Sequence, residues 1–243
     1  MRKVMGRGSA CVTLAMTLAA MSLGQAAGVK REDKEVAATR AQVTALRDAF
    51  VQATVAAGLK CGIAPPAIVV EDVPTFGRYD ETTNILTTSA WGQMAAEEKA
   101  FFYQLTGPGA TEALVRAEFE TDAHHWIFVH EMGHWWQECR HVTNAEKQYA
   151  YESGANRLAA AYWRERDPAL LAHMRGTFAG VLANVPVPVP AGQDVVTYFD
   201  AHYPYNFGPS QTAYPWFQSR MSVAVIDEKP APTFVEVLQQ TRP

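Results

Sequence analysis

Residues His130 to His134 constrain this chain more than any other stretch of its sequence. They read His-Glu-Met-Gly-His, so two histidines stand four positions apart and a glutamate follows the first. On an α-helix, positions i and i+4 share one face and lie one turn apart, while Glu131 lies about 100° round the helix. Two imidazoles so placed can bind one metal ion. The pattern therefore predicts a metal-binding helix, with the glutamate placed as a general base toward a metal-bound water.

The residues around this motif predict that its helix is buried. Large apolar side chains surround it at Trp126, Ile127, Phe128, Val129, Met132, Trp135 and Trp136. A helix that is apolar on nearly every side lies in a core, where two histidines and a glutamate need a partner such as a metal ion. Thr121 and Asp122 are candidates for the cap at the start of this helix.

The third metal ligand is expected from the next helix. Thr143 to Glu146 reads as a capping box, and Asp167-Pro168 ends the helix that it would start. Glu152 lies about two turns into that helix, and Asn156 follows on the same face, one turn later. Asn156 can accept a hydrogen bond from the far nitrogen of a ligand histidine.

Two other residues compete for the third position. His141 follows His134 by seven residues and is the alternative ligand. Glu138 continues the row of His130 and His134, but residues eight apart on a straight helix span about 12 Å, too far to share one ion. Glu152 is therefore the favoured third ligand.

These motifs resemble those of the gluzincin-type zinc metallopeptidases over residues 121–166. The resemblance implies that His130, His134 and Glu152 bind one Zn²⁺ and that Glu131 handles the water. The downstream motif of that family usually reads E-x-x-x-D, whereas this chain has Asn156 at the last position. A zincin-like α+β fold is also implied, mostly helical with a small sheet whose edge strand precedes the metal-binding helix.

The first 26 residues read as a secretory signal peptide. Basic residues precede an uncharged run from Ala10 to Leu23, and Gly24-Gln25-Ala26 suits the cleavage site. The run is too short for a membrane span, and Cys11 lies inside it, so neither a membrane anchor nor a lipid anchor is expected. We expect a secreted or periplasmic protein with one domain over 27–243.

Charge and cysteine content limit the partners further. Cleavage would remove three basic residues and no acidic one, which lowers the formal net charge from −4 to −7 and argues against a nucleic-acid partner. Cys61 and Cys139 would remain, and two thiols in an exported chain are expected to pair. Their disulfide would stabilise the fold by roughly 4 kcal/mol.

Periodicity and turn signals predict the other elements. Helices are expected over 32–58, 95–105, 169–182 and 233–240 and from near 111, with strands at 67–70 and 84–89 and a turn at Tyr79 to Glu81. The strand at 84–89 is a candidate edge strand for an extended peptide. The alternation of valine and proline from Val185 to Pro190 predicts a stiff connector and a possible lobe boundary near 184–192.

The remaining polar and aromatic residues divide into two groups. His124 and His125 lie off the face of His130 and are interpreted as structural or surface histidines. A donor for a developing oxyanion is expected from the C-terminal part, where the candidates are Tyr198, His202, Tyr203, Tyr205, Tyr214 and Arg220.

The sequence thus predicts an exported zinc-dependent metallopeptidase that acts on a peptide or protein. The first alternative is an inactive, metal-retaining binding or inhibitory protein of the same fold. The second is a structural zinc site, which three protein ligands disfavour because such sites normally have four.

Overall fold

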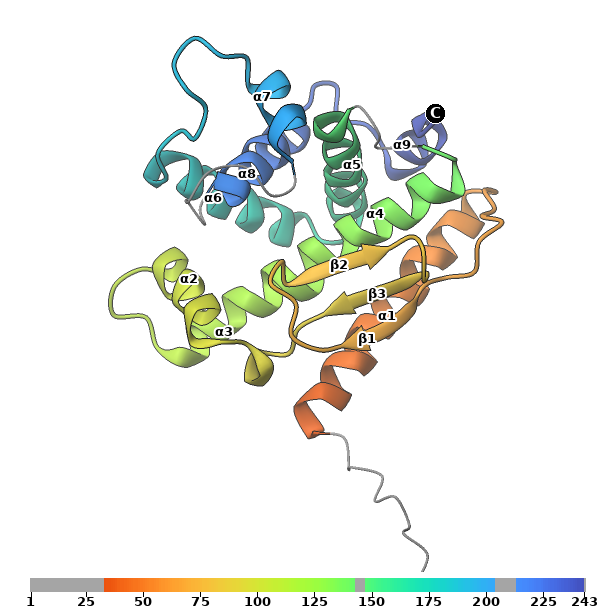
Figure 1. Cartoon of the computed structure of the whole chain (residues 1–243). Coiled ribbons are helices and arrows are strands. Elements are labelled where there is room, and N and C mark those ends of the chain that lie inside the picture. The colour runs from red at the N-terminus through yellow and green to blue at the C-terminus, as the bar shows by residue number, and fades with distance from the viewer. Residues whose placement is uncertain (1–32, 143–146, 204–212, 243) are drawn as a thin grey trace, which may run out of the picture. The chain divides into compact units, whose positions relative to one another are not determined.

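The computed structural model describes residues 33–142, 147–203 and 213–242, which form a mostly helical α+β unit with one small sheet (Figure 1). The elements are α1 (Lys34–Ala56), β1 (Ala67–Val70), β2 (Gly77–Asp80), β3 (Ile85–Thr88), the 3-10 turn η1 (Trp91–Gln93), α2 (Ala96–Thr106), α3 (Glu112–Thr121), the π-helical segment η2 (Asp122–Ile127), α4 (Phe128–Cys139), α5 (Gln148–Arg166), α6 (Pro168–Asn184), α7 (Val195–His202), α8 (Ala213–Ile226) and α9 (Phe234–Gln240). The α+β class expected from the sequence is confirmed.

The sheet has the order β1-β3-β2, with β1 parallel and β2 antiparallel to β3. The expectation that the strand at 84–89 is an edge strand is therefore wrong, because β3 pairs on both sides. The edge strand that packs against α4 is β2, part of which was expected to be a turn. Its residues alternate between buried and more exposed positions, and the turn follows at 81–84, where Asn84 has a φ of 53°.

The helix with the histidines continues directly from α3 through η2. The cap at its start is Thr111, whose side chain accepts a hydrogen bond from the amide of Leu114. The expectation that Thr121 or Asp122 caps the metal-binding helix is wrong, since the hydroxyl of Thr121 donates to the carbonyl of Ala117 inside α3. No cap is needed at Thr121 or Asp122, because α3, η2 and α4 follow one another without a break in the helical run.

Helices α4 and α5 pack at very short range. A Cβ atom placed on Gly133 would lie 3.0 Å from the Cα atom and 3.1 Å from the carbonyl oxygen of Ala155. Small residues at the crossing therefore bring the two backbones into direct contact. Around this crossing, α4 is enclosed by α1, β2 and α5, and the buried side chains of Trp135 and Trp136 belong to the largest core cluster.

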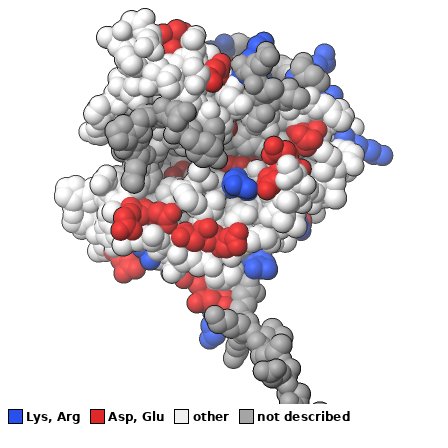
Figure 2. All heavy atoms as spheres, in the orientation of Figure 1, with Lys and Arg blue, Asp and Glu red and all other residues white. Residues whose placement is uncertain are grey.

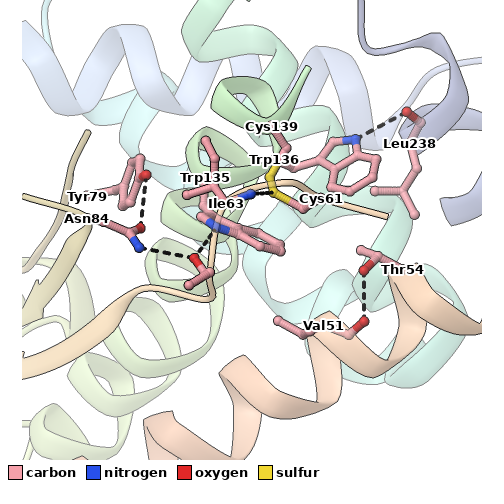
Figure 3. The surroundings of a disulfide bond; sticks show 11 residues. Val51, Thr54, Cys61, Ile63, Tyr79, Asn84, Trp135, Trp136, Cys139 and Leu238 are labelled. Atoms are coloured by element: carbon pink, nitrogen blue, oxygen red, sulfur yellow. Dashed lines mark hydrogen bonds between the residues drawn. A yellow bond between two sulfur atoms is a disulfide. The ribbon is translucent and has the colours of Figure 1, made fainter. Parts of the chain in front are cut away.

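The loop after α1 is fastened to α4 (Figure 3). Cys61 and Cys139 form a disulfide, as the sequence predicts, with their Cα atoms 5.1 Å apart. The indole of Trp135 and the side-chain amide of Asn84 both donate to the carbonyl of Ala64, each over 3.0 Å. The last turn of α4 is thereby connected to the loop at 61–64 and to the sheet.

Most of the other expected helices are present. Asp33, Asp167 and Thr233 cap α1, α6 and α9 with their side chains, close to the predicted starts. The expected capping box at 143–146 and the signal peptide lie outside the described residues. The segment from Val185 to Asp194 connects α6 to α7 without a helix or strand, and the lobe boundary expected there stays a prediction.

Two further observations concern membrane spans and surface charge. Within the described ranges, the helices are all too short or too polar to span a bilayer. Figure 2 shows several groups of acidic side chains on the face drawn there, in keeping with the formal net charge of −4.

Candidate metal centre

The two histidines of α4 point their outer ring nitrogens at the same place. His130 and His134 are one helical turn apart, and their Nε2 atoms are separated by 3.0 Å. Both side chains are buried, with 5% and 7% of the residue surface exposed. The four-residue spacing on a regular α-helix produces this convergence.

Glu152 of α5 supplies a carboxylate to the same point. Its Oε2 atom lies 3.2 Å from Nε2 of His130, and its Oε1 atom lies 3.8 Å from Nε2 of His134. The three residues form a buried group whose ligand atoms all lie within 4.8 Å of one another. His141, the alternative third ligand, is exposed just beyond the end of α4 and does not belong to this group.

Two side-chain amides determine which nitrogen of each histidine carries hydrogen. Nδ1 of His134 lies 2.8 Å from Oε1 of Gln137, whose Nε2 atom donates to the carbonyl of Tyr151 over 2.8 Å. A carbonyl only accepts, so the amide of Gln137 must present its oxygen to His134, and Nδ1 must donate. The ring of Tyr151 also stacks on the ring of His134 at 4.6 Å between centroids.

His130 is oriented in the same way, but by side chains of α5 and α8. Its Nδ1 atom lies 3.1 Å from Oδ1 of Asn156, which is 1% exposed. Nδ2 of Asn156 donates to Oε1 of Gln218, so Asn156 presents its oxygen to His130 and Nδ1 of His130 donates. Ser222 also donates to Oδ1 of Asn156. Asn156 therefore occupies the supporting position expected from the sequence.

The donor set fits a divalent transition-metal ion. In their neutral forms both histidines direct an Nε2 lone pair at the carboxylate of Glu152, so three acceptors converge without a hydrogen between them. Bond lengths of about 2.0–2.1 Å in a tetrahedral site place ligand atoms about 3.3 Å apart, and the observed separations of 3.0, 3.2 and 3.8 Å bracket this value. The group could hold one metal ion.

In the absence of a metal ion, a proton on His134 supplies positive charge beside Glu152. Burial, the largest single influence, acts to lower the pKa of His134, but the combined effect of Glu152, Glu131 and Gln137 outweighs it and raises the pKa to about 9. Burial acts to raise the pKa of Glu152, but the two histidines hold it well below its usual value. At neutral pH the metal-free centre therefore contains the imidazolium of His134 beside the carboxylate of Glu152.

Glu131 lies beside this group and is anchored by the sheet. Its Oε2 atom accepts a hydrogen bond of 2.7 Å from the backbone amide of Tyr79 in β2, and the residue is 8% exposed. Within the described part of the chain, its Oε1 atom accepts no hydrogen bond. The phenol of Tyr79 donates to Asn84, which extends the support to the loop of Figure 3.

Two of the candidate oxyanion donors reach the centre. The hydroxyl of Tyr203 donates to Oε1 of Glu152 over 2.9 Å, and that of Tyr214 lies 3.4 Å from Oε2. Burial and the charge of Glu152 raise the pKa of both phenols, which keeps them protonated as donors. The other described candidates, Tyr198, His202 and Arg220, make their contacts elsewhere on α7 and α8, and Tyr205 lies outside the described residues.

Sequence reasoning missed three polar side chains that support the ligands. Gln137, Gln218 and Ser222 complete the hydrogen-bond network, yet none of them stands at a recognisable motif position. The glycine at 154 is one trace of this network near Glu152 in the sequence, and the structure explains it, because a Cβ atom there would lie 2.7 Å from the amide nitrogen of Gln137. His124 and His125 are outside the group, with ring nitrogens on the carbonyls of Ser89 and Glu120.

Comparisons with known proteins find no significant similarity. The chain matches no protein-family model, and neither a curated protein nor a solved structure is significantly similar to it. The class of site is accordingly defined by its own residues: a buried His-His-Glu group on two helices, with a glutamate beside it.

Proposed function

We propose that the protein is an exported zinc-dependent metallopeptidase that hydrolyses amide bonds in peptides or proteins. The observation that carries the proposal is the convergence of His130, His134 and Glu152, with the carboxylate of Glu131 held beside them. Two imidazoles and one carboxylate form a ligand set typical of catalytic zinc, which leaves a position for water or substrate.

Zinc is the proposed ion because the donor set is mixed nitrogen and oxygen in a compact arrangement. When bound, zinc supplies Lewis acidity toward water and toward the scissile carbonyl. The protein's own contribution is to hold the three ligands in place with Gln137, Asn156 and Gln218.

Glu131 is the proposed general base. Tyr79 fixes one oxygen of the carboxylate through a backbone amide, and the other oxygen remains able to take a proton. Glu131 would accept the proton of the attacking water as the new C–O bond forms. It would then pass this proton to the leaving nitrogen as the C–N bond breaks.

The proposed place for a peptide substrate is the free edge of β2. Among the described residues this strand pairs only with β3, and on its other side the amide of Tyr79 donates to Glu131. An extended peptide added along β2 would run past the general base with its main chain hydrogen-bonded. The disulfide between Cys61 and Cys139 is compatible with export to an oxidising compartment.

The test is a variant that separates metal binding from turnover. Glu131→Gln should retain about one zinc per chain and lose at least on the order of 100-fold in peptide hydrolysis, since general base catalysis typically contributes that much. Glu138→Gln is the matched control, because it changes a half-buried glutamate of the same helix outside the metal group. Undiminished cleavage by Glu131→Gln, measured by mass spectrometry on a peptide library, would contradict the assigned role.

One observation favours a second candidate function. The three ligands are 3–7% exposed, and the phenols of Tyr203 and Tyr214 lie on the carboxylate of Glu152. Such closure suits an inactive, metal-retaining binding or inhibitory protein. Zinc bound by the wild-type chain together with no cleavage of any library peptide would favour this alternative.

A further inference from the structure

The residues His130 and Glu152 are joined behind the centre by a ring of polar contacts, three of which are hydrogen bonds. Nδ1 of His130 donates to Asn156 over 3.1 Å, and Asn156 donates to Gln218 over 2.8 Å. Gln218 donates to Oε2 of Glu152 over 2.7 Å, and this same oxygen lies 3.2 Å from Nε2 of His130. The ring thus connects three helices, α4, α5 and α8.

The polarity of this ring is fixed by its one ionised member. The carboxylate of Glu152 can only accept, so Gln218 must turn its Nε2 atom toward it and its Oε1 atom toward Asn156. Asn156 must then donate to Gln218 and accept from His130. A second donation from Gln218, to the hydroxyl of Tyr214 over 2.7 Å, agrees with this orientation.

This polarity explains why residue 156 is an asparagine. An aspartate there could accept from His130 but could not donate to Gln218. Gln218 would have to rotate its amide by half a turn to donate to the aspartate, which would bring its oxygen against the carboxylate of Glu152. With Gln218 in place, only a side chain that both accepts and donates satisfies the ring.

We propose that Gln218 is a positioning residue of the metal centre, and that Gln218 and Asn156 form a matched amide pair that sets the ring tautomer of His130 and the orientation of Glu152. The inference rests on the metal-binding part of the proposed function. It assigns a role to α8, which contributes no ligand to the metal group.

The experiment is a double-mutant cycle on metal affinity. Zinc affinity is measured by competition with a chromophoric chelator for the wild type, Gln218→Met, Asn156→Asp and the double variant. Gln218→Met should weaken zinc binding 10- to 100-fold, the usual effect of removing a residue that orients a ligand. Gln240→Met is the matched control, since it removes an exposed amide that pairs with Arg157 away from the centre.

The decisive result is a change of sign. In the wild-type background Asn156→Asp should weaken zinc binding several-fold, because the amide of Gln218 is forced against Glu152. In the Gln218→Met background the same change should strengthen zinc binding, because only the improved acceptor for His130 remains. Equal effects of Asn156→Asp in both backgrounds would overturn the matched pair, and thermal unfolding of each variant identifies any that fails to fold.

A second readout does not depend on metal. ¹⁵N NMR of the metal-free wild type should show His130 protonated at Nδ1, and Gln218→Met should produce a mixture of tautomers. If the wild type binds no zinc, the proposed function fails while this spectrum still tests the ring. An unchanged His130 tautomer in Gln218→Met would overturn the inference on its own.

Discussion

The two histidines of α4 are equivalent in the motif but are supported in different ways. His134 is held by Gln137, three residues further along the same helix, and by the stacked ring of Tyr151. His130 is held by Asn156 on α5, which depends in turn on Gln218 on α8. One ligand is therefore oriented almost locally, and the other through contacts between three helices. The comparison teaches that a symmetric motif does not imply a symmetric site.

The largest expected effect comes from removing either histidine. His130→Ala and His134→Ala should each weaken zinc binding by on the order of 1000-fold, since one of three protein ligands is lost. Isothermal titration against zinc would measure both. If one variant kept the wild-type affinity, the three-residue group would not be the metal site.

The second prediction concerns the pH dependence of metal binding at His134. Because the pKa of His134 is raised to about 9, zinc must displace a proton from it at lower pH. Apparent zinc affinity should rise about tenfold per pH unit between roughly 6.5 and 9, as this displacement implies. Chelator competition across this range would show it, and a flat profile would contradict the proton on His134.

The same groups predict how the metal-free fold responds to pH. The folded pKa of His134 is above its ordinary value, so its contribution to stability is present below about 6.5 and is lost as pH rises toward 9. The folded pKa of Glu152 is depressed, so its contribution is present above about 4.5 and is lost as pH falls. The melting temperature of the metal-free chain should therefore be highest between about pH 4.5 and pH 6.5. Thermal melts across this pH range and on both sides of it would test this.

The smallest effect is expected at the local support of His134. Gln137→Met should weaken zinc binding about tenfold, at the lower end of the range for such supports, because Tyr151 still stacks on the imidazole. Unlike Gln218→Met, it should leave the tautomer of His130 unchanged. A shift in the NMR signals of His130 in this variant would show that the two supports are not independent.

Much of the fold could be predicted because its signals are local. The helix that carries His130 and His134 follows from residue spacing, and the starts of α1, α6 and α9 follow from their capping residues. Local signals failed where pairing decides the structure. Nothing within Gly77 to Asp80 distinguishes a short strand from a turn, and nothing within 84–89 shows that two neighbours will pair with β3.

The residues of the centre also divide into those that the sequence predicts and those that it does not. Its ligands lie on two consecutive helices, so their spacing in the sequence was sufficient to predict them. Gln218 lies 66 residues from Glu152 on a helix whose sequence has no motif, and its role depends on how α8 packs against α5. Tyr203 and Tyr214 could be named only as members of a longer set for the same reason.

The contact between Gly133 and Ala155 limits which substitutions the motif can accept. Of its two interior positions, 132 is buried in the core, whereas 133 faces the backbone of α5 so closely that a methyl group there would press on Ala155. We expect a bulky side chain at 133 to push α5 outward and to move Glu152 away from the two imidazoles. The absence of a side chain at 133 thus helps to set the spacing between Glu152 and the two imidazoles, and a larger residue there should favour ions with longer metal–ligand bonds.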